Sequence, residues 1–189
     1  MSMKVGVSGL VYAKVLTDTE EGTTYGAIKA IPGTVSIENK TGSSIDNFFA
    51  DNGAYENTTS LGEITVDLEI ADPSPEVIAD ILGHKIVAGV MDFNVNDVPA
   101  DVAIGFVGLK ANGANRLVWL RKGKFKESDD TYKTKGSKSE PQSQKLSGSF
   151  VALKSNGSWK KTADSDAVGV LPATIANWFK VETLDVTIG

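Results

Sequence analysis

The sequence offers little material for catalysis, because it contains one histidine, His84, and no cysteine. Disulfide bridges, thiolate metal sites, cysteine nucleophiles and any serine and histidine pairing not built on His84 are therefore excluded. The phosphate-binding and dinucleotide-binding glycine motifs, the nucleophile elbow and the HExxH zinc motif do not occur. His84 follows the expected end of a helix, where an imidazole can interact with the terminal carbonyls. We expect no enzymatic activity and no cofactor.

Carboxylates occur in two groups whose spacing can be compared with that of catalytic carboxylate pairs and calcium-binding loops. Asp129 and Asp130 are adjacent in a basic segment, without the difference in burial that paired acid and base catalysis requires. Asp46, Asp51 and Glu56 superficially suggest a calcium loop, but they lack the D-x-[DN]-x-[DN]-G spacing and a flanking helix pattern. We expect neither group to form a catalytic or metal site.

Basic residues gather in the segment 121–138, "RKGKFKESDDTYKTKGSK", where seven Lys and Arg stand beside three acids. Residues 110–145 hold ten of the 19 basic and four of the 24 acidic residues, so the remainder carries nine basic and twenty acidic residues, a balance of −11. Lys and Arg can neutralise phosphates, and aromatic residues can stack on bases. The acidic whole and the interrupting acids instead favour a solvated segment, or one that meets an acidic surface on a neighbouring copy.

The elements that must position these residues are mostly strands. In "EITVDLEI", residues 63–70, apolar and polar residues alternate with the period of a strand that has one buried face. Six further segments are rich in β-branched and aromatic residues, and Asn-Gly in two connections is typical of tight hairpins. These six predicted strands are residues 4–16, 25–38, 101–110, 115–122, 146–154 and 178–188.

One helix is predicted at residues 74–82, within "DPSPEVIADILGHK". Ser74 can cap it, Pro75 suits its first position, and Gly83 can take the left-handed conformation that ends it. Its apolar residues form one stripe, so the helix should pack on a sheet. A second helical turn is possible in "PATIANWF".

Two polar segments, residues 39–61 and 123–145, are read as long loops and are longer than a compact domain tolerates without a purpose. No apolar run approaches the roughly 20 residues that span a bilayer. We therefore expect a single domain over residues 1–189: a mainly β, antiparallel sandwich or barrel with one flanking helix. An N-terminal arm, the two long loops and a C-terminal strand or arm would extend it.

The order of features resembles the major tail tube proteins of long-tailed, non-contractile (siphovirus-type) bacteriophages. The resemblance is carried by "NFFADNGAYENTTSLGEITVDLEI", the short helix ending in "DILG", "ADVAIGFVGLKANGANRLVWLRKGKF", and "KTKG" before a closing strand pair. It covers roughly residues 25–155, and the arms are less distinctive.

This resemblance implies a virion structural protein that self-assembles into stacked hexameric rings, forming a hollow tail tube through which DNA is ejected. The implied partners are other copies of the chain, a tape measure protein, and tail terminator or tail-tip proteins. DNA would pass without specific binding and no membrane would be involved. The protein would be assembled in the host bacterial cytoplasm and reside in the virion tail.

The wall of a tube through which DNA passes should not bind DNA, so we expect negatively charged residues to line its lumen. Glu63, Asp67 and Glu69 on the polar face of the strand at 63–70 are the first candidates, with Glu38 as a further one. The alternative for this face is an ordinary solvated sheet surface. Further candidates for contacts between subunits or rings are aromatic and basic residues in the two polar segments: Phe48, Phe49, Tyr55, Lys133, Lys135 and Lys138. Trp159 and Trp178 also look exposed enough to reach an interface.

Three other functions stay open at this point. A tube protein of a contractile tail, a tailocin or a secretion-type injection machine would share the architecture. A ligand-binding β-sandwich module should display an aromatic platform or calcium ligands, and neither pattern occurs in the sequence. A nucleic-acid-binding domain would rest on the basic segment alone.

Overall fold

The fold was analysed in a computed structural model of the whole chain. The structure describes residues 2–50, 53–127 and 143–187, and for 44–50, 53–60, 186 and 187 it describes the backbone alone.

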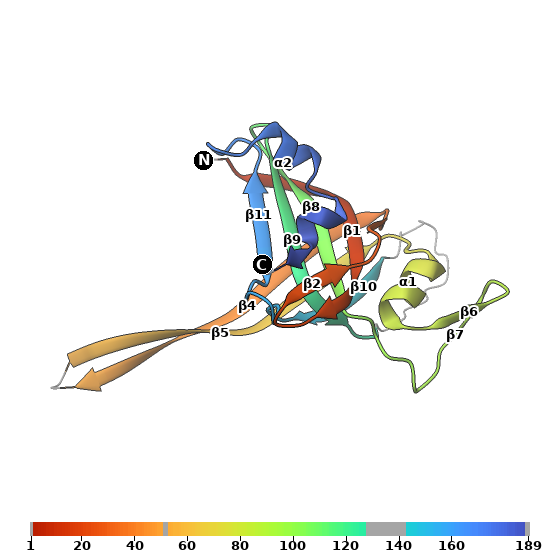
Figure 1. Cartoon of the computed structure of the whole chain (residues 1–189), viewed down its shortest axis with the longest axis horizontal. Helices are drawn as coiled ribbons and strands as arrows, with labels where there is room; N and C mark the ends of the chain where they lie inside the picture. The colour runs from red at the N-terminus through yellow and green to blue at the C-terminus, as the bar shows by residue number, and fades with distance from the viewer. Residues whose placement is uncertain (1, 51–52, 128–142, 188–189) are drawn as a thin grey trace, which may run out of the picture.

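One large antiparallel sheet forms the body of the protein (Figure 1). Its main path runs β12-β2-β1-β8-β9-β10-β5-β4, while β11 pairs with β9 and β3 pairs with β1. The strands are β1 Lys4–Asp18, β2 Gly22–Tyr25, β3 Lys29–Ala30, β4 Thr34–Ala50, β5 Gly53–Ile70, β8 Val102–Lys110, β9 Asn115–Phe125, β10 Gln144–Phe150, β11 Lys160–Asp164 and β12 Val186–Thr187.

The elements outside this sheet are a small hairpin and three helices. The hairpin pairs β6 Lys85–Val87 with β7 Val90–Asp92. The helices are α1 Pro75–Leu82, α2 Pro172–Ala176 and α3 Val181–Leu184. The predicted fold class is confirmed: the protein is mainly β, with an antiparallel sheet and few helices. The sheet curls around its core without closing into a barrel.

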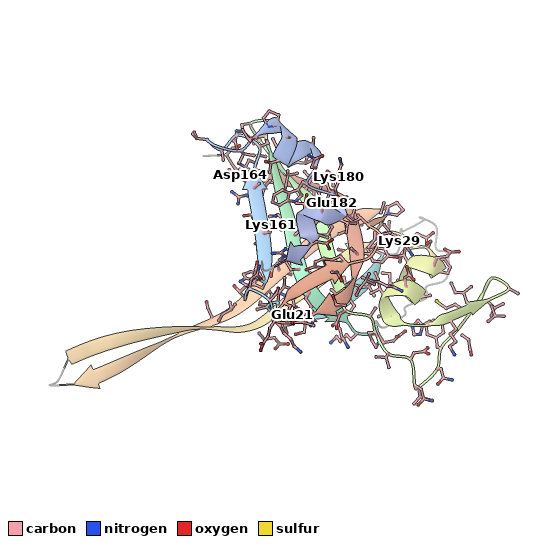
Figure 2. The ribbon with its side chains drawn as sticks, in the orientation of Figure 1. Glu21, Lys29, Lys161, Asp164, Lys180 and Glu182 are labelled. Atoms are coloured by element: carbon pink, nitrogen blue, oxygen red, sulfur yellow. The ribbon has the colours of Figure 1, made fainter. Side chains whose placement is uncertain are left out.

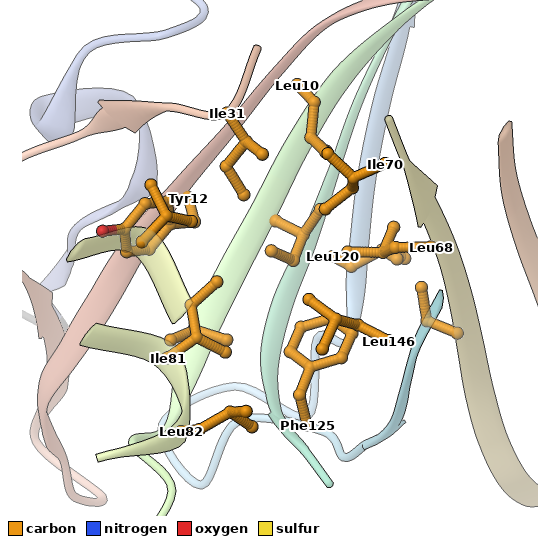
Figure 3. Packing of buried hydrophobic residues seen from close by; sticks show 14 of the residues in the cluster. Leu10, Tyr12, Ile31, Leu68, Ile70, Ile81, Leu82, Leu120, Phe125 and Leu146 are labelled. Atoms are coloured by element: carbon orange, nitrogen blue, oxygen red, sulfur yellow. The ribbon is translucent and has the colours of Figure 1, made fainter. Parts of the chain in front are cut away.

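The main core lies inside the curl of the sheet and beneath α1 (Figure 3). Its fully buried side chains include Tyr12 from β1, Leu68 from β5, Ile81 from α1, and Leu120 and Phe125 from β9. The predicted alternation of β5 is confirmed, because Ile64, Val66, Leu68 and Ile70 are all buried while the intervening residues face solvent at least in part.

A second core covers the opposite face of β1, β8 and β9. Ala13, Ala103 and Trp119 lie there, each next in sequence to a residue of the main core, as expected for strands whose neighbours face opposite sides. Trp178 and Leu184 from the C-terminal segment complete this core, and the Trp119 indole N–H donates to the Trp178 carbonyl at 2.9 Å.

Helix α1 follows the predicted signals with one correction. Pro75 begins it, and Gly83 ends it in the left-handed region at φ 84°. A side chain at Gly83 would also be impossible because its Cβ would lie 2.2 Å from the Val98 carbonyl oxygen. The Ser74 hydroxyl does not cap the backbone as predicted. It hydrogen-bonds the Glu76 side chain instead.

Two predicted segments have a different structure from the one expected. Residues 39–61 are not a loop, because β4 and β5 continue through them as paired strands up to Ala50 and Gly53. Residues 178–188 are not one strand: they contain α3 and only the two-residue β12. The first Asn-Gly turn joins paired strands, β8 and β9, as predicted. The second joins β10 to β11, and each of these pairs with β9.

Candidate assembly surfaces

The acidic residues proposed for a lumen do share one face of the sheet. Glu63, Asp67 and Glu69 alternate with the buried residues of β5, and Glu38 on β4 is the cross-strand partner of Asp67. The sheet therefore brings the four predicted carboxylates together on its outer surface over β4 and β5.

Hydrogen bonds fix two of these carboxylates. The Ser147 hydroxyl donates to Asp67 at 2.6 Å, and together with a contact from Lys40 this lowers the pKa of Asp67. Hydroxyls of Ser143 and Ser36 donate to Glu69 at 2.5 and 3.1 Å, and they lower its pKa in the same way. These hydrogen bonds thus favour the ionised form of both groups.

Lysines border this acidic face, which sequence reasoning did not anticipate. Lys40 lies 3.3 Å from both Glu38 and Asp67, and the hydrogen bond to Asp67 and then that to Glu38 raise its pKa. Lys145 on β10 is the cross-strand partner of Glu69. The acidic face over β4 and β5 thus includes one lysine, Lys40 on β4, and has a second, Lys145, beside it on β10.

Beyond this face, β4 and β5 leave the body as a two-stranded ribbon (Figure 1). We define the ribbon as residues 43–61. In the described backbone it pairs only with itself, from Ser43 opposite Leu61 to Ala50 opposite Gly53. The pairing of β10 with β5 covers only Ile64 to Ile70. The ribbon thus extends well past the last strand that supports it.

A pair of glycines marks the point where the ribbon leaves the sheet. The register shifts between Thr41 and Ser43, beside Gly42. A Cβ on Gly62 would lie 2.2 Å from the Gly42 carbonyl oxygen, so this position admits no side chain. The loop prediction for residues 39–61 rested on their polar composition, whereas here a glycine beside that segment permits the close approach of two strands.

Most of the aromatic and basic interface candidates fall outside what the structure describes. The backbones of Phe48, Phe49 and Tyr55 belong to the ribbon, but their side chains lie outside the described part. Lys133, Lys135 and Lys138 lie outside the described residues altogether, as do Asp51, Asp129 and Asp130.

The two tryptophans expected near an interface are less exposed than the sequence suggests. Trp178 is buried in the second core, so its prediction as an exposed residue is wrong. Trp159 is partly buried and packs against the main core. The tryptophan of "PATIANWF", Trp178, is therefore a core residue.

His84 is buried and its contacts differ from the predicted interaction with helix carbonyls. Its Nδ1 lies 2.8 Å from an Asp97 oxygen, and its ring packs on Phe93 at 4.4 Å between centroids. Its Nε2 is 3.2 Å from a Glu127 oxygen, without the geometry of a hydrogen bond. These contacts join the end of α1 to the turn that follows β7.

That turn belongs to a surface that sequence reasoning missed. The hairpin of β6 and β7 projects from the body on the side opposite the ribbon (Figure 1). It and the turn behind it carry five exposed large apolar residues, which are Val87, Val90, Phe93, Val95 and Val98. The available signal was the alternation of Met91, Phe93 and Val95 with polar residues, which has the period of a strand with one buried face. In the structure Phe93 and Val95 are exposed instead.

The described part of the chain contains no helix that is long and apolar enough to cross a membrane. Within that part, no group of three or more His, Cys, Asp or Glu residues is arranged to hold a metal ion. No protein family model matches the chain, and no curated protein matches it.

Proposed function

We propose that this chain is a tail tube protein, a structural subunit that assembles into stacked hexameric rings around a channel for DNA. Three observations support this proposal: the resemblance of residues 25–155 to tail tube proteins, the mainly β fold, and one further feature of the structure. That feature is the ribbon, which supports it more strongly than any other.

The ribbon is hard to explain in a protein that works alone. A two-stranded hairpin without a further strand or a helix against it is only marginally stable in water. Its outer edges also leave backbone N–H and C=O groups free to pair with another chain. In a ring or a stack of rings, a neighbouring subunit would supply the missing packing, as the tail tube architecture implies.

The acidic face supports a conduit for DNA. Carboxylates repel phosphates, whereas a wall of free lysines would bind them through counterion release. Lys40 does not create such a wall, because it lies between Glu38 and Asp67. We assign Glu38, Glu63, Asp67 and Glu69 to the channel side on this argument. The proposed protein catalyses no reaction and needs no cofactor.

Electron microscopy of the purified chain tests this function. Negatively stained samples across a range of protein concentrations should contain rings or tubes with a central hole. Mass measurement by light scattering should give a multiple of the 20.0 kDa chain. A chain that stays monomeric at every concentration would contradict the proposal.

A further inference from the structure

The surface opposite the ribbon has the character of a preformed contact site. We call residues 87–98 the valine turn. Val95 is 96% exposed, and Val87, Val90, Phe93 and Val98 are exposed as well. Exposed apolar residues of this kind lower the solubility of a monomer, and they usually mark a contact with another molecule.

The polar groups of the valine turn are used to hold its shape. The backbone N–H of Asn94 donates to Asp97 at 2.9 Å, and the N–H of Asn96 donates to the Asn94 side chain at 2.9 Å. His84 lies 2.8 Å from the same Asp97 carboxylate. The turn is thus fixed before any partner arrives, which removes part of the entropic cost of binding.

The backbone on either side also fixes the turn to α1. The N–H of Ala100 donates to the Ile81 carbonyl at 3.0 Å. The Val98 carbonyl lies so close to Gly83 that no side chain fits there. The valine turn therefore has a rigid support, with its polar atoms directed inward and its valines directed outward.

The charged residues indicate which kind of surface the valine turn binds. The valine turn contains two Asp, of which Asp92 is exposed, and no basic residue, whereas residues 151–161 contain three Lys and no acidic residue. We call residues 151–161 the lysine segment. It runs from the end of β10 into β11, on the side of the body away from β6 and β7 (Figure 1), and Figure 2 shows Lys161 there.

Carboxylates of the described residues do not neutralise Lys160 and Lys161, although the Lys161 ammonium donates a hydrogen bond to the Thr183 carbonyl at 3.0 Å. Each of these two lysines lies over a tryptophan ring. Burial and nearby positive charges lower the pKa of both lysines. Val151, half exposed in the same segment, adds an apolar contact. An acidic, apolar partner would relieve this positive charge.

We infer that the valine turn of one copy binds the lysine segment of a second copy of this chain. The two surfaces differ and lie on opposite sides of the body, so the contact is head to tail. Such contacts repeat from copy to copy and produce a closed ring or an open filament. The inference rests on the proposed function and deepens it, since it names the surfaces that join neighbours within a ring.

The apolar part of the contact is tested with two exposed valines. Val95→Ser should raise the protein concentration at half-assembly, followed by sedimentation velocity, by about tenfold or more. Val168→Ser is the matched control, because Val168 is fully exposed at 106% and lies outside both surfaces. It should leave the half-assembly concentration unchanged.

The charged part is tested by exchange of charge. Asp92→Lys and Lys160→Glu should each weaken assembly by about tenfold, more so at low salt. An equimolar mixture of the two variants should assemble like the wild type, because every contact in an alternating arrangement then joins opposite charges. Asp72→Lys and Lys180→Glu are the matched controls, at exposed positions outside both surfaces.

The outcomes separate this inference from the proposed function. If the wild type forms rings and Val95→Ser, Asp92→Lys and Lys160→Glu form them equally well, the named surfaces are wrong and the tube function stands. If the wild type associates through these surfaces into open filaments only, the surfaces stand and the tube function is wrong. Restoration in the mixture would also show that both variants are folded.

Discussion

The ribbon and the valine turn both extend from the body, but they differ in what holds them in place. The ribbon is long and rich in Ser, Asn, Asp and Thr, and in the described backbone it pairs only with itself. The valine turn is short and apolar on the outside, and α1, His84 and Asp97 hold it from within. The comparison suggests two kinds of contact: one completed by the partner, and one ready before the partner arrives.

Removal of the ribbon should have the largest effect. Ser43 and Leu61 are cross-strand partners, so an Asn-Gly turn in place of residues 44–60 closes the hairpin in the same register. We expect a folded chain that forms neither rings nor tubes, because the partner's contact is gone while both cores remain. Circular dichroism checks the fold and electron microscopy checks assembly. Tubes of normal appearance would show that the ribbon has no part in assembly.

Gly62→Ala sharpens the role of the close approach at the base of the ribbon. The new methyl group would collide with the Gly42 carbonyl oxygen, and relief of the clash should cost about 2 to 3 kcal/mol and disturb the ladder. Gly42→Ala is the matched control, since its Cβ would lie 3.4 Å from the nearest atom. Urea unfolding of both variants measures the difference. Equal stability would mean that the strands separate there without cost.

His84→Ala tests whether the valine turn is held from within. The side chain is buried with Asp97 and Phe93, so its loss should cost about 2 kcal/mol of unfolding free energy. Hydrogen exchange should accelerate in residues 93–98 and remain unchanged in the ribbon. Acceleration of both regions alike would contradict the separate anchoring of the two hairpins.

The smallest effect concerns the attachment of α1 to the sheet, on which the valine turn depends. Asp80 on α1 accepts hydrogen bonds from Tyr12, Lys14 and Lys29. Burial opposes its ionisation, but these bonds outweigh burial and lower the pKa of Asp80 to about 2.

Because the pKa is lowered in the folded state, the stabilisation is complete above the unfolded value near 4. It is lost as the pH falls toward about 2. Asp80→Asn should remove about 1 kcal/mol at pH 7 and reduce the loss of stability between pH 5 and pH 2. Thermal unfolding of wild type and variant across this range provides the measurement. Parallel stability curves would show that Asp80 does not contribute.

The sequence predicted the elements whose residues face a core. The alternation in β5, the apolar stripe of α1 and the Gly83 stop were readable because burial imposes a period on the sequence. The shared face of Glu63, Asp67 and Glu69 followed from the same alternation.

The ribbon could not be predicted this way, because in the described backbone it pairs only with itself, and backbone pairing sets no period. The prediction of a strand at residues 178–188 was wrong for another reason. Their β-branched and aromatic residues favour a strand, but burial of Trp178 and Leu184 against the second core outweighs that preference. In the valine turn, Met91, Phe93 and Val95 alternate with polar residues as in a half-buried strand. Only the folded structure reveals that Phe93 and Val95 are exposed.

The pairing of β2 with β12 joins residues 22–25 to residues 186 and 187, and this has a consequence during synthesis. The strands that bear the ribbon and the acidic face are complete by Phe150. Trp119 is covered only when Trp178 and Leu184 have left the ribosome. A nascent chain therefore displays an apolar face until residues 178–184 have emerged from the ribosome, and folding on the side that carries α3 has to wait for them.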